Sequence, residues 1–181
     1  MSRAMPLYLM LKPPLSQRAA LLRCVSSFGL DPSYWPDKYH CTLLGLGESQ
    51  DWSPAMLEQL CRLLATIDAE PCAIAFDRID GNLLRGRKGL SGLRELQRKL
   101  ARQVARLGFP IPAYSFSPHL SLAYGAPSDA SAAIHPISWP ATEFLLIRSI
   151  HGVGHEQLGR WPLRRRQLEL PLRGGRNRAA A

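Results

Sequence analysis

The sequence predicts an α+β fold in which two similar half-units face each other, and three observations support this prediction. Strand and helix patterns follow in the order strand, helix, strand, helix, hairpin, helix, strand, strand and edge strand, which is typical of α+β proteins. Two of the predicted strands carry the same motif, His40-Cys41-Thr42 and His119-Leu120-Ser121. The 181 residues are 46% hydrophobic and 20% charged, a composition that supports a globular core without disulfide bonds.

The first strand and the first helix precede the His40 motif. Residues 5–11 are predicted to form a strand that ends at Lys12-Pro13-Pro14, because proline and the residue before it disfavour continuation. The helix that follows is closed by Gly29 and has apolar residues at helical spacing, namely Leu15, Ala19, Leu22 and Val25. A turn-rich loop over residues 31–36 then leads into the strand of residues 39–44.

A second helix, a hairpin and a third helix fill the middle of the chain. Ser53 is placed to cap the second helix, and Pro54 takes its first position, where a missing N–H breaks no helical bond. The predicted buried stripe of this helix is Met56, Leu60, Leu63, Leu64 and Ile67. Residues 71–80 alternate as a strand, and residues 83–88 return as its hairpin partner. The third helix ends at Gly108 and is predicted to bury Leu93, Leu96, Leu100, Val104 and Leu107.

The C-terminal part begins with the second histidine strand, residues 118–124. Residues 127–136 are mostly small and are predicted to form a loop. Residues 139–150 are predicted to form one further strand. This strand is continuously apolar from Phe144 to Ile147, which predicts a central position in a sheet.

The charge balance predicts an anionic partner. The chain has 23 Lys and Arg against 14 Asp and Glu, a formal net charge of +9 and a pI near 9.9. Such a surface attracts polyanions, and RNA is the natural candidate. Charge alone does not separate RNA from an acidic protein or a small phosphate ester.

Cysteine usage and hydropathy predict a soluble, cytoplasmic protein. The cysteines show no C-x-x-C spacing, so free thiols are expected at Cys24, Cys41, Cys61 and Cys72. Residues 5–11 lack the flanks of a signal peptide, and prolines and serines in the uncharged stretch 107–128 exclude a membrane span. We expect residues 1–172 to form a single domain and residues 173–181 a flexible basic tail. We also expect a monomer that contacts no membrane.

The two histidine motifs are the candidate catalytic residues. Side chains two apart in a strand project from the same face, so His40 stands beside Thr42 and His119 beside Ser121. A single His-x-Ser or His-x-Thr triplet is common by chance. The pair, each embedded in an apolar strand with leucines at matching positions, favours a functional interpretation.

The paired motifs resemble the His-x-Thr/Ser signatures of the 2H phosphoesterase superfamily, and the bacterial RNA 2′,3′-cyclic phosphodiesterases, also called 2′-5′ RNA ligases or LigT-like proteins, in particular. The resemblance implies a bilobal, pseudo-twofold fold whose antiparallel sheets line a central cleft with helices outside. Residues 151–163 resemble the terminal segment of that family, which turns into a Trp-Pro-Leu edge strand. The implied activity is metal-independent hydrolysis of 2′,3′-cyclic phosphate ends to 2′-phosphates, with a weak reverse ligation that forms 2′-5′ bonds and no cofactor.

Two histidines and two hydroxyls supply the groups that this reaction requires. An imidazole with a pKa of about 6.5 suits both proton roles, since one ring can be neutral while the other is charged. Thr42 and Ser121 would donate to the non-bridging phosphate oxygens. We assign the base to His119 and the acid to His40, although the sequence leaves the two roles interchangeable.

Two positions depart from the family pattern. Tyr124 stands where arginine is common, five residues after the second histidine, and Gly45 stands where phenylalanine is frequent. Arg85 and Arg87 share one face of their predicted strand and are candidates for the missing cation, although they could equally face water. Tyr124 or Tyr8 could stack on a base.

The remaining histidines are weaker candidates. His155 lies in the glycine-rich turn, at a position where the family often has tyrosine, and is a possible substrate contact; His151 lies in the same turn. His135 precedes a proline in the predicted loop and is expected to have no role.

Alternative functions remain open at this stage. The same mechanism could act on another cyclic phosphate, such as ADP-ribose 1″,2″-cyclic phosphate, or the chain could be a non-catalytic RNA- or nucleotide-binding module. A metal site is disfavoured because the sequence has no His-x-His, no H-E-x-x-H and no Asp or Glu next to either motif. The expected partner is RNA or a nucleotide with a cyclic phosphate.

Overall fold

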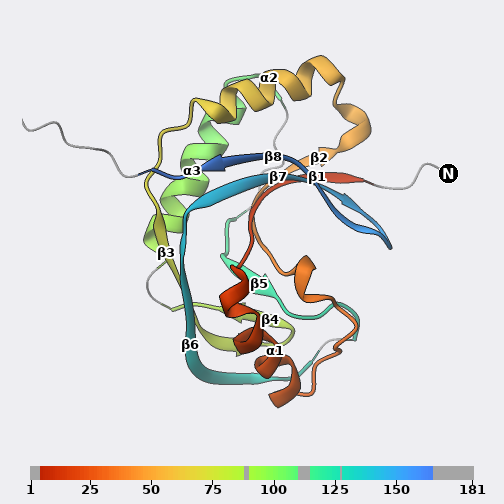
Figure 1. Ribbon diagram of the computed structural model, residues 1–181, viewed down its shortest axis with the longest axis vertical. Helices are drawn as coiled ribbons and strands as arrows, with labels where there is room; N and C mark the ends of the chain where they lie inside the picture. The colour runs from red at the N-terminus through yellow and green to blue at the C-terminus, as the bar shows by residue number, and fades with distance from the viewer. Residues whose placement is uncertain (1–4, 88–89, 110–114, 127, 165–181) are drawn as a thin grey trace, which may run out of the picture.

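Two four-stranded antiparallel sheets form the centre of the structure, a computed structural model that describes residues 5–87, 90–109, 115–126 and 128–164. The first sheet has the strand order β2-β1-β7-β8, and the second has the order β5-β4-β3-β6 (Figure 1). The first sheet therefore joins strands from both ends of the chain, whereas the second is built from its middle. The predicted α+β class with two facing sheets is confirmed.

The first sheet carries the His40 motif. Its strands are β1 (Pro6–Leu11), β2 (Cys41–Glu48), β7 (Glu143–Ile150) and β8 (Gly154–Pro162). β7 lies between β1 and β8, which confirms the central position predicted for its apolar run. β8 is the edge strand that was expected near the C-terminal end.

The second sheet carries the His119 motif. β3 (Cys72–Asp80) and β4 (Leu83–Arg85) form the predicted hairpin, with Gly81 in its turn at a φ of 60°. β5 (His119–Ser121) pairs with β4, and β6 (Ser131–Ala141) pairs with β3. β5 is shorter than predicted because β4, the strand that it pairs with, is itself only three residues long.

Three predicted boundaries in this region are wrong or incomplete. The loop predicted over residues 127–136 is a strand from Ser131 onward, and this strand tolerates its prolines because β6 lies at the edge of its sheet. The single strand predicted over residues 139–150 is split at Thr142, where the chain passes from the second sheet to the first. The return strand predicted up to residue 88 ends at Arg85, and Lys88 itself lies outside the described residues.

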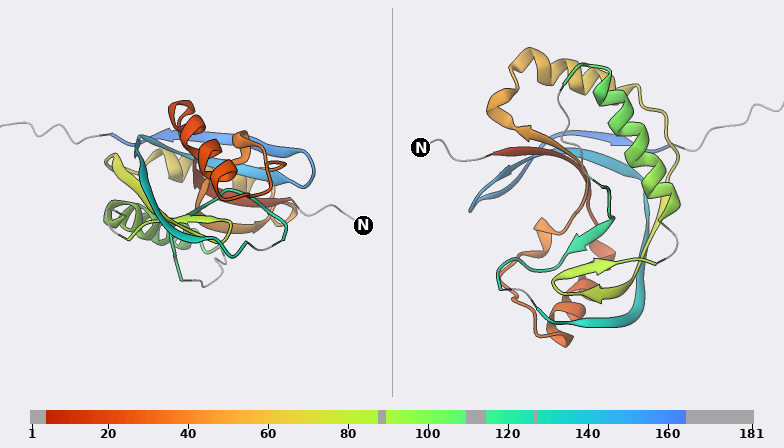
Figure 2. Two further views of the ribbon diagram at one scale, coloured as in Figure 1. Left: turned by 90° about the horizontal axis from the view of Figure 1, so that it is seen from below. Right: turned by 180° about the vertical axis from the view of Figure 1, so that it is seen from behind.

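The second and third helices cover the outside of the sheets, as Figure 2 shows. α2 (Pro54–Ala65) begins as predicted, with the Met56 backbone N–H donating to the Ser53 hydroxyl at 3.2 Å. α3 (Ser91–Ala105) contacts β2 of the first sheet and β3 of the second, so it bridges the two halves. Its predicted apolar stripe is confirmed as buried, with Leu107 packed at the margin of the core.

The first helix differs from its prediction. Leu15–Gln17 form a 3-10 turn, and α1 (Arg18–Ser27) begins only after it. The change of helical pitch shifts the buried stripe to Leu21 and Val25, while Leu15 is 79% exposed. Gly29, at a φ of 59°, ends the helical segment as predicted. Two further 3-10 turns, Pro36–Lys38 and Ser49–Asp51, flank β2.

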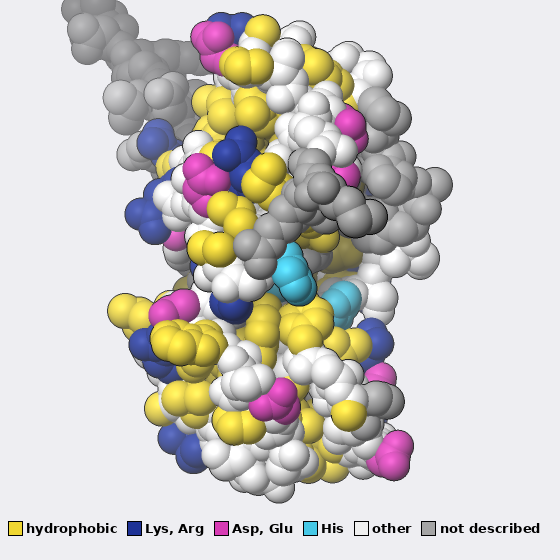
Figure 3. All heavy atoms as spheres, turned by 90° about the vertical axis from the view of Figure 1, so that its right-hand side faces the viewer, with side chains coloured by type: hydrophobic (Ala, Val, Ile, Leu, Met, Phe, Trp, Pro, Cys, Tyr) yellow, Lys and Arg dark blue, Asp and Glu magenta, His cyan; other side chains and the backbone are white. Residues whose placement is uncertain are grey.

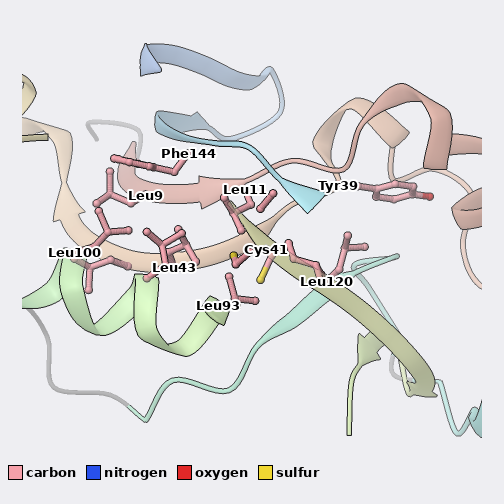
Figure 4. Packing of buried hydrophobic residues seen from close by; sticks show 14 of the residues in the cluster. Leu9, Leu11, Tyr39, Cys41, Leu43, Leu93, Leu100, Leu120 and Phe144 are labelled. Atoms are coloured by element: carbon pink, nitrogen blue, oxygen red, sulfur yellow. The ribbon is translucent and has the colours of Figure 1, made fainter. Parts of the chain in front are cut away.

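One hydrophobic core extends through both halves of the molecule. Figure 4 shows side chains from β1, β2, α3, β5 and β7 that meet in it, including Leu11, Cys41, Leu93, Leu120 and Phe144. Because this core is shared, the positions of the two sheets, and of the two histidine motifs, are coupled. In the part of the chain that the structure describes, no helix is long and apolar enough to cross a membrane.

Candidate active site

The two histidine motifs lie side by side although they belong to different sheets. His40 directly precedes β2, His119 begins β5, and these two strands contact each other. The backbone N–H of His119 donates to the sulfur of Cys41, which ties the start of one strand to the start of the other. Figure 3 shows histidine side chains at the waist between the two halves. The structure thus brings the two predicted catalytic residues together.

Both imidazole rings are held in the same way. The Nδ1 atom of His40 lies 2.7 Å from the carbonyl oxygen of Lys38, and the Nδ1 atom of His119 lies 2.8 Å from that of Ser117. A carbonyl oxygen only accepts hydrogen bonds, so Nδ1 carries the proton in each ring. Nε2 is therefore the nitrogen left for chemistry in both histidines.

The surroundings of His40 favour its neutral form. Burial lowers the pKa of His40 below 6.5, the hydrogen bond to Lys38 opposes that shift, and the charges of Lys12 and His119 lower the pKa further. The effect of His119 on His40 also shows that the two rings are within electrostatic reach. At neutral pH, His40 Nε2 therefore presents a lone pair that can accept a proton.

The hydroxyl residues lie where the strand periodicity predicts. Cys41, Leu43, Leu120 and Leu122 are fully buried, so the intervening positions face the other way. Thr42 lines a cavity beside His40. Ser121 is largely buried and, being two residues after His119 in β5, shares the face of that histidine.

A cavity of about 330 Å³ lies against His40 and Thr42. It is lined from β1, the loop before β2, the segment after β5 and the β7–β8 turn, by residues that include Tyr8, Tyr34, Lys38, Tyr124 and His155. His119 and Ser121 do not line this cavity. A larger cavity of about 600 Å³ beside the start of α3 contains none of the predicted site residues, so the chemistry favours the smaller one.

Tyr8 occupies the space next to Gly45 where the family often has phenylalanine. The two residues are paired across β1 and β2, and a Cβ atom at Gly45 would lie 3.9 Å from Cε1 of the Tyr8 ring. The absence of a side chain at Gly45 is thus matched by an aromatic ring from the neighbouring strand. This contact supports the sequence-based choice of Tyr8 as an aromatic residue of the site.

Tyr124 packs against a residue that sequence reasoning missed. Its ring meets that of Tyr34 edge to face, with centroids 4.6 Å apart, and Tyr124 remains 55% exposed. The Tyr34 hydroxyl donates to the carbonyl oxygen of Lys38 at 2.9 Å, the same oxygen that holds His40. No sequence signal identified Tyr34 or Lys38, because the segment before β2 that holds them has no hydrophobic periodicity.

The two candidate arginines are placed differently from each other. Arg85 is paired in register with His119 and lies beside it, but its Nε donates to Asp80 at 2.7 Å and its guanidinium also donates to Ser117. Its charge is therefore compensated within the fold. Arg87 is exposed and lies beyond the end of β4, so the strand face that it was predicted to share with Arg85 is not formed.

His155, at the start of β8, packs its ring against that of His40. The two rings lie edge to face with centroids 5.0 Å apart. Burial, together with the charges of His40, Lys12 and Lys38, lowers the pKa of His155 to about 4. Its Nδ1 atom is buried and has no hydrogen-bond partner among the described residues. His151 lines the same cavity, whereas His135 is exposed on β6.

The lowered pKa of His155 predicts how the free energy of unfolding depends on pH. The unfolded chain binds a proton on this ring below pH 6.5, but the folded chain does so only near pH 4, so the free energy of unfolding falls as the pH drops through that window. His155→Gln should therefore flatten the pH dependence of the unfolding free energy between pH 6.5 and 4. Urea denaturation at several pH values measures this, and parallel curves for the two proteins would contradict it.

Metal-ligating side chains do not gather at the site. Among the described residues, no three His, Cys, Asp or Glu side chains are placed to hold one metal ion together. The described cysteines are free, with Cys41 and Cys72 buried.

Comparison with known proteins adds independent observations. Residues 12–151 match the 2′-5′ RNA ligase superfamily. A crystal structure of a phosphoesterase is similar at a TM-score of 0.70 and 26% identity, covering 89% of this chain and 99% of that one. E. coli LigT complexed with 3′-AMP gives a TM-score of 0.70 and 26% identity over 90% of this chain and 99% of LigT.

One further structure supports the fold alone, and a search of curated proteins gave no match. The protein TT0787 of Thermus thermophilus has the same fold at a TM-score of 0.67 and 24% identity, over 88% of this chain and 98% of that one. The family match over more than half of the chain and the agreement of both sheets with LigT lead to one conclusion: this chain belongs to the 2′-5′ RNA ligase superfamily, as a 2H phosphoesterase with a LigT-like fold.

Proposed function

We propose that this protein hydrolyses 2′,3′-cyclic phosphate ends of RNA or nucleotides to 2′-phosphates, without a metal ion. The observation that carries the proposal is the matched pair His40 and His119. Each ring is anchored through Nδ1 to the carbonyl two residues earlier, each is followed by a hydroxyl two residues later, and the two come from different sheets. Such a pair can act from two sides of one phosphorus atom.

The hydrolysis requires two proton transfers in line with phosphorus. A water molecule gives a proton to the Nε2 lone pair of one histidine while its oxygen bonds to phosphorus. The bond from phosphorus to the ribose 3′ oxygen breaks, and Nε2–H of the other, charged histidine protonates that oxygen. Thr42 and Ser121 donate to the non-bridging oxygens as negative charge builds on them. One proton is taken and one is returned, so the two rings exchange protonation states.

The structure favours the reverse of the acid and base roles that the sequence suggested. Burial and the neighbouring positive charges stabilise neutral His40, which is the form that a base requires. An acid would need a ring whose charged form is stabilised, and the surroundings of His40 do the opposite. We therefore assign the base to His40 and the acid to His119.

A nucleotide fits the lining of the cavity. Tyr8, Tyr34 and Tyr124 present aromatic rings to it, and aromatic side chains stack on bases without strong sequence preference. The related E. coli LigT has been solved with 3′-AMP, which supports a nucleotide ligand for this chain. The net charge of +9 favours an RNA end over a neutral ligand. The free cysteines are compatible with the cytoplasmic location that we propose.

Incubation with a 2′,3′-cyclic mononucleotide in the presence of a chelator tests the proposal. We expect hydrolysis at an undiminished rate and a 2′-phosphate as the product, resolved from the 3′ isomer by chromatography. Loss of activity that zinc restores would contradict the metal-independent mechanism. Hydrolysis of ADP-ribose 1″,2″-cyclic phosphate alone would move the assignment to another cyclic phosphate. Nucleotide binding without hydrolysis of any cyclic phosphate would identify a binding module.

A further inference from the structure

Two lysines lie near the histidines of the cavity: Lys38 lines the cavity itself, and Lys12 lies outside its lining. Lys12 follows the last residue of β1, and Lys38 is the last residue of the 3-10 turn before His40. The charge of Lys12 acts on both His40 and His155, and the charge of Lys38 acts on His155. Lys12 is therefore within electrostatic reach of both rings, and Lys38 is within reach of His155.

Each lysine is held in position by the fold. The Nζ atom of Lys12 donates to the carbonyl oxygen of Asp37 at 2.8 Å, which uses one of its three N–H groups. Lys38 lines the cavity, and its Cε atom would lie 3.7 Å from a Cβ atom at Gly154, so its stem runs along the start of β8. Both side chains are thus directed by contacts rather than free in solvent.

The positive charge of these lysines is largely uncompensated. No carboxylate of the described residues forms an ion pair with Lys12 or Lys38, and the cavity lining contains no Asp or Glu. The nearby Asp37 carboxylate acts on Lys12 from a distance but is itself paired with Arg18. Burial lowers the pKa of Lys12, as expected for a cation that lacks a direct counter-ion.

Arg85 differs from the two lysines because its charge is compensated by a carboxylate. Its guanidinium lies next to His119 but is already paired with Asp80. A buried or half-buried cation without a counter-ion favours binding of an anion, whereas a paired cation must first give up its partner. The geometry thus favours the lysines over the arginine as phosphate ligands.

We propose that Lys12 and Lys38 form the cationic part of the phosphate-binding site, in place of the arginine that the family commonly has at the position of Tyr124. The proposal rests on the proposed function and names the groups that neutralise the charge of the substrate. A cyclic phosphate diester carries one negative charge, and a second develops as water adds to phosphorus. Two cations beside the packed rings of His40 and His155 stabilise the doubly charged state more than the bound substrate, which accelerates the reaction.

Lys38 has a second role in this arrangement as a positioning residue. Its backbone carbonyl oxygen accepts the hydrogen bond from His40 Nδ1, and its side chain reaches into the same cavity. The residue that orients the base therefore also brings a positive charge to the cavity that this base lines. A side-chain substitution leaves the backbone carbonyl in place, so the charge can be tested separately from the orientation.

Substitution of the lysines tests this proposal by binding and by catalysis. We expect Lys12→Gln and Lys38→Gln each to weaken binding of inorganic phosphate and of a nucleoside 2′-phosphate, and to lower kcat/KM, by about 10- to 100-fold. The double variant should lose more than either single variant. Lys38→Arg should retain most of the binding, because it keeps the charge. Calorimetric titration of the full chain measures the binding without any turnover.

Matched controls separate this proposal from the function on which it rests. Arg23→Gln removes one positive charge from the exposed face of α1 and should leave phosphate binding unchanged. Lysine variants that stay folded and bind phosphate like the wild type would overturn the proposal, as would a larger loss in Arg85→Gln. A wild type that binds phosphate through the lysines but hydrolyses no cyclic phosphate would contradict only the proposed function.

Discussion

Alanine in place of His40 or of His119 is expected to lower kcat for cyclic phosphate hydrolysis by about 10²- to 10⁴-fold. Each substitution removes one of the two proton transfers and leaves water or solvent ions to replace it. The rings contribute no large apolar area to the core, so the fold should persist. Steady-state kinetics with a 2′,3′-cyclic mononucleotide measures the loss, and thermal unfolding confirms that the variants are folded.

The pH dependence of the activity distinguishes the histidine that acts as base from the one that acts as acid. With His40 as the base, activity falls as the pH drops through the lowered pKa of this ring, so the acid limb lies below pH 6.5. His40→Ala should abolish that limb, whereas His119→Ala leaves the base in place and should keep it. His135→Ala, on the exposed face of β6, is the control and should match the wild type. Near-normal rates in either active-site variant would exclude the two-histidine mechanism.

Loss of either hydroxyl is expected to have the second-largest effect. Thr42→Val and Ser121→Ala should each lower kcat by about 10²- to 10³-fold, the range found when one preorganised donor to a developing oxyanion is removed. Valine has nearly the shape of threonine, so the Thr42 substitution tests the hydroxyl and not the packing. Single-turnover measurement of the hydrolysis step is the appropriate assay.

The hydroxyl variants have an internal control. Ser138→Ala removes an exposed hydroxyl from β6 and should leave kcat unchanged. If Thr42→Val or Ser121→Ala raised KM while leaving kcat intact, these hydroxyls would bind the ground state and the transition state equally and would not accelerate the chemical step. That outcome would remove them from the catalytic mechanism that we propose.

Much of the fold could be predicted from local patterns. The N-terminal cap of α2, the buried stripe of α3 and the hairpin of β3 and β4 all depend on contacts between residues close in sequence. The predictions that were wrong concern segments whose structure depends on contacts with distant parts of the chain. Leu15 and Leu22 have the right spacing for a buried stripe but are exposed, because a 3-10 turn changes the phase before α1 begins. The start of β6, which has mostly small residues and a proline, forms a strand because β3 offers it an edge.

The sequence by itself determined the two His-x-hydroxyl motifs and the face that each side chain takes, because alternation along a strand is a property of the backbone alone. Only the tertiary structure decided that Tyr8 lies over Gly45 and that Lys12 and Lys38 lie near His155. These contacts join residues far apart in the chain. They depend on which distant strands lie together in the first sheet, and no local pattern encodes that pairing.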